Sequence, residues 1–343
     1  MNGSKNATIK VIAKERNTTG KIRSGVVSVK ASDGTTKSVT IEQSRFFAEG
    51  DGSVQNPYKI TNADDLFCLK YAIGMGLNIS IENDINVSSI LPDDGWKSVE
   101  EFRGVLNGNN HNILGLWGAP FIDKNYGTIS GINLILDSKG ISGSGAICSY
   151  LYSGGTIENC IVKGNVIGLS EYTGGICGIS GGGTIRRCSM SGKVSNGRYV
   201  GGIVGYGSGD IKECFSEGNV IGSYYVSGIN NGTISVSVSD SYSNATVELT
   251  AVNGEVAGIS TQSKCFNCYY SGKIIGNSNK FGVSGVLSSH SYYNSETSGA
   301  SQGGIPKISI DMKKQATYEG WDFNTIWKID EGKSYPQLRC FDK

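Results

Sequence analysis

The sequence has 343 residues, of which 50 are Gly and only 5 are Pro, and its formal net charge is +1. Abundant Gly with scarce Pro indicates an ordered β protein with many turns, because disordered linkers are rich in both residues. The balanced charge argues against a nucleic-acid partner, and no apolar run approaches the roughly 18 residues that a membrane helix needs.

Residues 7–44 contain three runs in which apolar and polar residues alternate, which is the pattern of half-buried strands. The runs cover residues 8–12, 26–29 and 38–43, and Asp33-Gly34 between the last two is a hairpin-turn signal. The phrases at residues 17–20, 23–26 and 40–43 resemble the second half of a BACON domain, an immunoglobulin-like sandwich of Bacteroidetes proteins. We therefore expect residues 1–45 to form a partial BACON-like β-sandwich.

A short helix is predicted near residues 62–74. Asn62 can cap its first turn, Asp65 follows three residues later, and Gly74 and Gly76 end it. Its apolar residues share one face, which suits a lid over the open end of the structure that follows: Leu66, Leu69, Ala72 and Ile73.

A repeat organises residues 127–300. One column of the alignment begins at Cys160 and advances by 28, 26, 27, 27 and 23 residues; it reads Cys160, Cys188, Cys214, Ser241, Cys268 and Ser291. A second column carries pairs of small residues followed by Ile or Val, at residues 174–176, 201–203, 227–229, 257–259 and 284–286. A fixed period of this length indicates a solenoid or a propeller.

The length of the repeat and the residue pattern within each unit distinguish between the repeat folds. A propeller blade needs roughly 40 residues, and a helical repeat needs a long 3.6-residue pattern that these units lack. Short apolar pairs between Gly, Ser and Asn instead predict strands joined by turns. We expect an all-β fold, a right-handed parallel β-helix with about 26 residues per coil and roughly seven coils, in which like residues lie over like.

The sequence has nine cysteines, and those of the repeat column, Cys160, Cys188 and Cys214, are interpreted as core residues. Three successive members of one column cannot all pair, so stacked buried thiols are favoured over disulfides. Cys265 and Cys268 form a lone Cys-x-x-Cys without a second pair, which is a weak metal signal. We expect neither a metal nor a cofactor.

The repeat resembles the GLUG motif of bacterial surface proteins. Residues 201–205 read Gly-Gly-Ile-Val-Gly, residues 174–178 are the next best copy, and the flanks at residues 50–60 and at the Trp-rich tail are similar to those of this family. The resemblance implies a GLUG-type β-helix over residues 46–300 and a C-terminal cap over residues 301–343. It also implies an extracellular or cell-surface location, although the polar residues that follow Met1 are not the pattern expected of an export signal.

Catalysis is the competing interpretation, because β-helices host polysaccharide lyases and glycoside hydrolases. The best acidic pair is Glu158 and Glu213, with Arg186 and Arg187 between them, and an ion-paired exposed strand explains it more simply. Neither of the two histidines, His111 and His290, has a catalytic context. We predict a non-enzymatic, secreted or cell-surface, adhesin-like protein with no catalytic residues.

One surface feature remains. Tyr172, Tyr199 and Tyr225 are spaced by 27 and 26 residues and would form a ladder across three coils. The rings could stack on one another structurally, or they could contact sugar faces. We predict these three residues as a ligand site whose partner is a host or bacterial glycan or a surface protein. A second, less regular group comprises Tyr269, Tyr270, Tyr292 and Tyr293.

Overall fold

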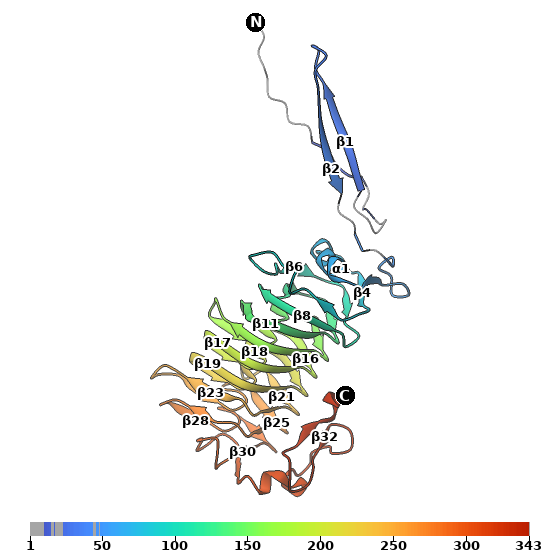
Figure 1. Ribbon diagram of the computed structural model, residues 1–343. Helices are drawn as coiled ribbons and strands as arrows, with labels where there is room; N and C mark the ends of the chain where they lie inside the picture. The colour runs from blue at the N-terminus through green and yellow to red at the C-terminus, as the bar shows by residue number, and fades with distance from the viewer. Residues whose placement is uncertain (1–9, 15–16, 18–22, 44–45, 48, 343) are drawn as a thin grey trace.

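The computed structural model describes residues 10–14, 17, 23–43, 46–47 and 49–342. From residue 58 onward the chain winds into stacked coils, which Figure 1 shows as successive rungs. Strands of neighbouring coils pair in parallel and in the predicted register: Ile157 lies opposite Ile129 in one coil and Ile185 in the other. The predicted parallel β-helix is confirmed, with about 8 turns.

Two long sheets run along the solenoid. The first contains β3 (Tyr58–Ile60), β4 (Asn78–Ile81), β6 (Val99–Phe102), β7 (Val105–Asn107), β9 (Ile122–Asn125), β10 (Thr128–Ser130), β12 (Cys148–Tyr152), β13 (Thr156–Glu158), β16 (Cys177–Arg186), β18 (Val204–Lys212), β20 (Asn230–Gly232), β21 (Ser237–Ser239), β25 (Lys264–Phe266) and β29 (Ser288–Ser289).

The second sheet carries the predicted tyrosine ladder. It contains β5 (Ile85–Asn86), β8 (Asn112–Gly118), β11 (Asn133–Ser142), β14 (Ile161–Ile167), β15 (Tyr172–Gly174), β17 (Ser189–Gly201), β19 (Phe215–Ser227), β22 (Tyr242–Ser243), β23 (Thr246–Leu249), β24 (Glu255–Ala257), β26 (Tyr269–Tyr270), β27 (Ile274–Ile275), β28 (Asn279–Phe281), β30 (Tyr292–Asn294) and β31 (Ile305–Lys307).

A left-handed residue turns the chain from the first sheet into the second in each coil. Its φ lies between 46° and 53° in six successive coils, at Asn159, Arg187, Glu213, Asp240, Asn267 and His290. The residue that follows is always the Cys or Ser of the column found in the sequence. Asn and Asp tolerate this conformation, whereas Arg, Glu and His are strained in it. Packing against the neighbouring coils must offset this strain.

Close backbone approach explains the Gly-Gly column. A Cβ atom on Gly175 would lie 2.2 Å from the carbonyl oxygen of Gly202, and one on Gly202 would lie 1.9 Å from that of Gly228. Neither distance is compatible with a side chain, so each coil rests on the bare backbone of the next. The repeated glycine is therefore a packing requirement of this corner.

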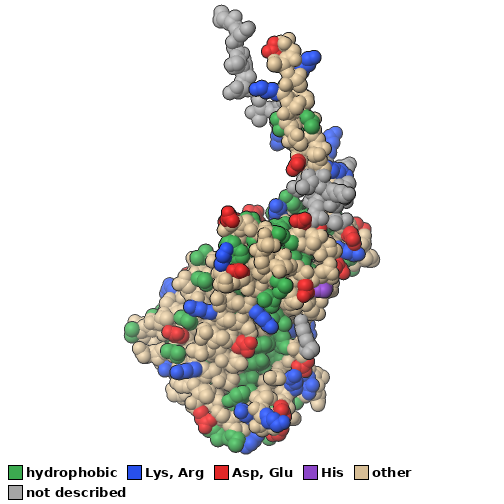
Figure 2. All heavy atoms as spheres, viewed as in Figure 1, with side chains coloured by type: hydrophobic (Ala, Val, Ile, Leu, Met, Phe, Trp, Pro, Cys, Tyr) green, Lys and Arg blue, Asp and Glu red, His purple; other side chains and the backbone are tan. Residues whose placement is uncertain are grey.

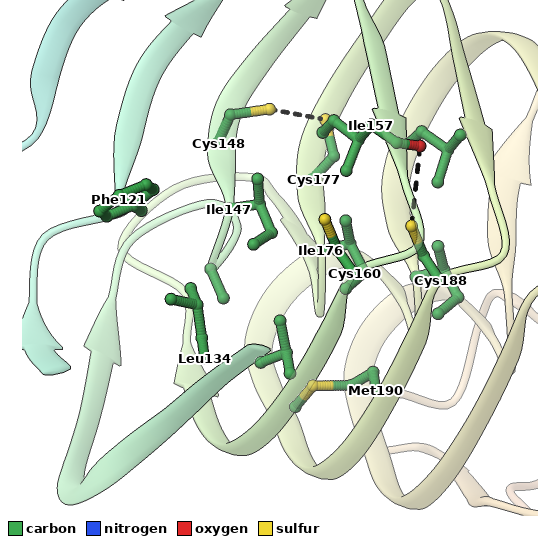
Figure 3. Close-up of a cluster of buried hydrophobic side chains, with 14 of the residues drawn as sticks. Phe121, Leu134, Ile147, Cys148, Ile157, Cys160, Ile176, Cys177, Cys188 and Met190 are labelled. Atoms are coloured by element: carbon green, nitrogen blue, oxygen red, sulfur yellow. Dashed lines mark hydrogen bonds between the residues drawn. The ribbon is translucent and has the colours of Figure 1, made fainter. Parts of the chain in front are cut away.

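The interior is filled by aliphatic side chains and thiols stacked along the axis (Figure 3). Cys160, Cys188 and Cys214 are fully buried, and the Cys188 thiol donates to the Ile157 carbonyl at 3.6 Å. All nine cysteines are free, as predicted for the column. One contact was not foreseen: the Sγ atoms of Cys148 and Cys177, in adjacent coils, are 3.6 Å apart.

The N-terminal end of the solenoid is covered by one helical turn. Helix α1 (Ala63–Phe67) is capped by the Asn62 side chain, which accepts from the Asp65 amide at 3.0 Å, and it continues as the 3₁₀ turn η1 (Cys68–Tyr71). Leu66 and Leu69 are fully buried in the core. The helix is shorter than the predicted range 62–74, and Ile73 lies beyond it and is exposed.

The segment before the solenoid forms an antiparallel hairpin of β1 (Arg23–Lys30) and β2 (Thr36–Gln43), which projects from the body (Figure 1). The turn lies at Asp33-Gly34, as predicted, with a φ of 89° at Gly34. The first predicted strand is not formed over Lys10–Ile12, while Thr8, Ile9 and much of the BACON-like phrase at residues 17–20 lie outside the described residues. The division into three domains stays a prediction.

A second apolar cluster lies at the C-terminal end. It is built by β32 (Trp327–Lys328), β33 (Gln337–Leu338) and the 3₁₀ turns η2 (Asp311–Lys313), η3 (Gln315–Thr317) and η4 (Arg339–Phe341). Trp327 is fully buried there against the rings of Tyr242, Tyr269 and Trp321.

Candidate functional site

The three predicted site residues come together on the second sheet. Tyr172 of β15 lies opposite Tyr199 of β17, which lies opposite Tyr225 of β19. Both pairs of ring centroids are 5.1 Å apart, and the rings are tilted by 38° and 33°. Each tyrosine is only partly buried, so part of this ladder faces solvent.

Two further tyrosines extend the ladder. The Tyr206 ring, from β18 of the other sheet, lies 5.2 Å from the rings of both Tyr172 and Tyr199. The Tyr224 ring lies 4.6 Å from that of Tyr225 and nearly perpendicular to it, at 81°. Sequence reasoning missed both, because neither belongs to the repeating column; adjacency to Tyr225 was the only available signal for Tyr224. We call these five residues the tyrosine cluster.

Charged side chains border the tyrosine cluster at both ends. Arg198 Nη1 donates to Glu171 Oε1 at 3.0 Å, and the Arg198 guanidinium lies 4.8 Å from the centroid of the Tyr224 ring. At the other end Glu255 of β24 lies opposite Tyr225. Aromatic faces, hydroxyls, a guanidinium and carboxylates therefore occupy one surface.

The tyrosine hydroxyls of the ladder are neutral at physiological pH. Their ordinary pKa of 10 already ensures this, and desolvation raises the pKa of Tyr172, Tyr199 and Tyr225 further, so the hydroxyls can both donate and accept hydrogen bonds. Desolvation also raises the pKa of Glu255. The cluster is thus equipped for a polar ligand with apolar faces, which matches the amphipathic character of Tyr.

A groove of about 800 Å³ adjoins the cluster. Ile167, Ser195 and Ile221 lie in register across three coils and line it. Glu171 and Arg198 line it as well, so the groove and the tyrosine cluster share a boundary.

The second tyrosine group is structural. Tyr269, Tyr270, Tyr292 and Tyr293 are all buried, with 4% or less of each side chain exposed. Tyr269 continues a stack with Phe215 and Tyr242, in which neighbouring centroids are 4.9 Å apart and the planes are within 4°. The C-terminal cluster covers this stack, so it is not available to a ligand.

The residues considered for catalysis are engaged in ion pairs. Glu158 Oε2 accepts from Arg186 Nε at 2.7 Å and from Arg187 Nη2 at 3.0 Å, and the Glu213 carboxylate lies 3.6 Å from the Lys212 ammonium. Figure 2 shows charged side chains of both signs scattered over the visible face of the solenoid.

The two histidines and the Cys-x-x-Cys pair have surroundings that suit a structural role. His111 Nδ1 lies 3.1 Å from Asp84 Oδ1, and the His290 carbonyl accepts from the Trp321 indole. Cys265 and Cys268 are both fully buried, and no group of three potential metal ligands occurs among the residues that the structure describes. In the same part of the chain, no helix is long and apolar enough to cross a membrane.

Comparison with protein families matches residues 196–221 to the GLUG motif, a range that contains the best copy found in the sequence, residues 201–205. Halomucin of Haloquadratum walsbyi is 29% identical over 157 residues, which are 46% of this chain and 2% of halomucin. A protein of Evansella cellulosilytica, provisionally named as a Gly-rich membrane protein, is 29% identical over 110 residues, which are 30% of this chain and 12% of that protein. The chain therefore matches only a small share of each relative's length.

Two solved structures share the fold. A Bacteroides ovatus protein, provisionally named as an immunoglobulin A1 protease, matches with a TM-score of 0.63 and 22% identity over 86% of this chain and 96% of that chain. A structure named IgA1 protease matches with a TM-score of 0.58 and 14% identity over 87% of this chain and 27% of that chain. At these identities the likeness concerns the fold alone.

Proposed function

We propose that this chain is a non-enzymatic, adhesin-like binding module of a secreted or cell-surface protein, and that its tyrosine cluster contacts a glycan. The observation that carries the proposal is the in-register ladder of partly exposed tyrosine rings. Ring faces pack against the C–H groups of sugars while neutral hydroxyls reach sugar oxygens, which is the amphipathic use of Tyr at interfaces. The glycan belongs to a host cell or to another bacterium.

The relatives support a surface location. Halomucin and the Gly-rich membrane protein carry names of extracellular or membrane-associated proteins, and the GLUG resemblance points the same way. An origin in a Bacteroidetes-type bacterium and a BACON-like identity of residues 1–45 stay predictions. The near-neutral net charge favours a glycan over a nucleic acid.

Enzymatic activity is the competing proposal, because the two similar structures are named as IgA1 proteases. The ion-paired state of Glu158 and Glu213 argues against a role for them as a catalytic acid and base. Incubating the chain with IgA1, and separately with a polysaccharide panel in the presence of calcium, tests the point. Time-dependent cleavage of either substrate, absent from a heat-denatured control, would overturn the non-enzymatic assignment.

The binding test replaces Tyr172, Tyr199 and Tyr225 together by Ala and measures binding to a glycan array beside thermal unfolding. We expect binding to fall at least tenfold, because three aromatic faces are removed at once and a loss of about 1.4 kcal/mol is already tenfold in affinity. A matched control replaces Tyr126 and Tyr152, a stacked pair on other coils with centroids 4.0 Å apart. Unchanged binding in the triple variant would refute the site, and lost stability with unchanged binding would make the ladder structural.

A further inference from the structure

The groove beside the tyrosine cluster carries an uncompensated positive charge. Three of its lining residues are charged, namely Glu171, Lys193 and Arg198. Glu171 and Arg198 neutralise each other at 3.0 Å. Lys193 is exposed, and within the described part of the chain it forms no ion pair. One free ammonium group therefore faces the groove.

The rest of the lining is suited to hydroxyl-rich ligands. It consists largely of side-chain amides and hydroxyls, among them Asn165, Ser170, Ser223 and Thr250, around the partly exposed Ile167 and Ile221. The hydroxyls of Ser170, Ser223 and Thr250 donate to backbone carbonyls, so they offer their acceptor lone pairs to the hydroxyl donors of a sugar. Ile167 and Ile221 offer apolar surface to the C–H groups of a sugar while the surrounding hydroxyls and amides reach its oxygens, which favours a sugar over an apolar peptide side chain.

We propose that this groove binds a carboxylate-bearing sugar, a uronic acid residue within a polysaccharide, with Lys193 as the partner of the carboxylate. The inference rests on the proposed glycan-binding function and names the class of glycan. Arg198 connects the two surfaces, because it lines the groove while its guanidinium lies 4.8 Å from the Tyr224 ring and 6.0 Å from the Tyr199 ring. A chain bound in the groove would continue onto the tyrosine cluster.

The charged groups around the groove set its preference. The Glu171 carboxylate is held by Arg198, so it repels an incoming anion less than a free carboxylate would. Lys193 is solvent-exposed, so its attraction for a carboxylate is screened by salt and weakens within a Debye length of about 10 Å at 0.1 M ionic strength. Binding of the acidic sugar should therefore weaken as ionic strength rises.

The experiment compares three uronate polymers, namely polygalacturonate, alginate and hyaluronan, each beside its own carboxyl-methylated form, by isothermal titration calorimetry with the full chain. We expect at least one polymer to bind about tenfold more tightly than its methyl ester, since a charge-assisted hydrogen bond is lost on esterification. Lys193→Gln should abolish that preference, and Lys193→Arg should retain it. Lys264→Gln, on the other sheet, is the matched control and should leave the preference intact.

The outcomes separate this inference from the proposed function. Binding of neutral glycans that depends on the tyrosine ladder, without any preference for a carboxylate, would overturn the acidic-sugar assignment and leave the glycan function standing. Poly-glutamate binding as tight as that of the uronate polymers would replace the sugar by an acidic peptide. Binding of no glycan, charged or neutral, would overturn both proposals. If the preference for the carboxylate survived in Lys193→Gln and thermal unfolding were unchanged, the role of Lys193 would be overturned.

Discussion

The glycine at the corner between coils has a role that only the third dimension reveals. A Cβ atom on Gly202 would lie 1.9 Å from the Gly228 carbonyl oxygen and 2.7 Å from the Ser216 Cβ. Because the clash is with backbone, no side-chain rotation can relieve it. We expect Gly202→Ala to lower the free energy of unfolding by about 1–3 kcal/mol, the usual cost of overpacking.

Urea denaturation monitored by circular dichroism measures this change. Gly76→Ala is the matched control, since nothing lies within 4 Å of a Cβ atom at Gly76. An equal loss of stability in both variants would contradict the packing argument and point to a general effect of replacing glycine.

Burial of Glu255 should make the stability of the fold depend on pH with a defined sign. Burial raises the folded-state pKa of Glu255 above its ordinary value of 4.5, so the protonated form favours folding. This contribution is fully present below pH 4.5 and is lost as the pH rises through the folded-state pKa. Glu255→Gln, a neutral isostere, should therefore raise the thermal midpoint at pH 7 and leave it unchanged below pH 4.5.

Glu296 provides a control of opposite sign. Hydrogen bonds from the side chain and amide of Ser309 lower the pKa of Glu296, so its stabilising effect is present above pH 4.5 and is lost as the pH falls. Glu296→Gln should lower the midpoint at pH 7, with the difference vanishing in acid. Differential scanning calorimetry of both variants from pH 3 to 8 tests the pair, and shifts of the same sign at pH 7 would refute the assignment.

At the level of single residues, the core could be predicted and the site only in part. Cys160, Cys188 and Cys214 recur at one place in the repeat, and stacking of identical coils makes that recurrence visible in the sequence. The same periodicity revealed Tyr172 and Tyr199. It could not reveal Tyr206, because this ring reaches the ladder from the other sheet.

The C-terminal cap is the element whose packing the sequence describes least. Its Trp and Tyr residues predicted a cap, but their contacts with the stack of Phe215, Tyr242 and Tyr269 join segments far apart in the chain. No repeat relates the two sides of such a contact. The helix at the other end was predicted from its cap residue Asn62, and it ends early because Leu69 already lies in a 3₁₀ turn.

Trp327 tests how much the cap contributes to stability. It is fully buried and contacts the rings of Trp321, Tyr242 and Tyr269. Trp327→Ala should lower the free energy of unfolding by about 3–5 kcal/mol, as expected for a large buried aromatic side chain.

The control for this change is Trp117→Ala. Trp117 is partly exposed and has the Lys139 ammonium 3.8 Å from its ring centroid, an interaction that contributes about 0.5–1 kcal/mol. Equal costs for the two variants in chemical denaturation would mean that the cap is only loosely attached to the solenoid.

At the scale of the whole molecule, stability is distributed along the axis. Each coil of a solenoid contacts only its neighbours, so coils can open separately and the ends have the fewest supports. The central strands are the longest, with 13 residues each in β17 and β19, whereas β22, β26 and β27 have 2 residues each. The described coils are therefore most strongly paired in the middle and less so toward the C-terminal end.

The free cysteines make this gradient measurable, because eight of the nine are buried and they are spread along the coils. Burial raises the pKa of the Cys160, Cys188 and Cys265 thiols well above the ordinary value, so only local opening allows them to react at neutral pH. Cys340 should also react slowly. The residue as a whole is exposed, but desolvation of its thiol raises the pKa to about 12.

We expect pulse alkylation in increasing urea to label Cys265 and Cys268 before Cys188 and Cys214, with each site quantified by peptide mass spectrometry. The reason is that opening the short-stranded coils breaks fewer backbone hydrogen bonds than opening the coils of β17 and β19. Labelling of the fully unfolded chain corrects for the intrinsic reactivity of each thiol. If all buried thiols became labelled at one urea concentration, the solenoid would unfold as a single cooperative unit, and the caps rather than the strand lengths would set its stability.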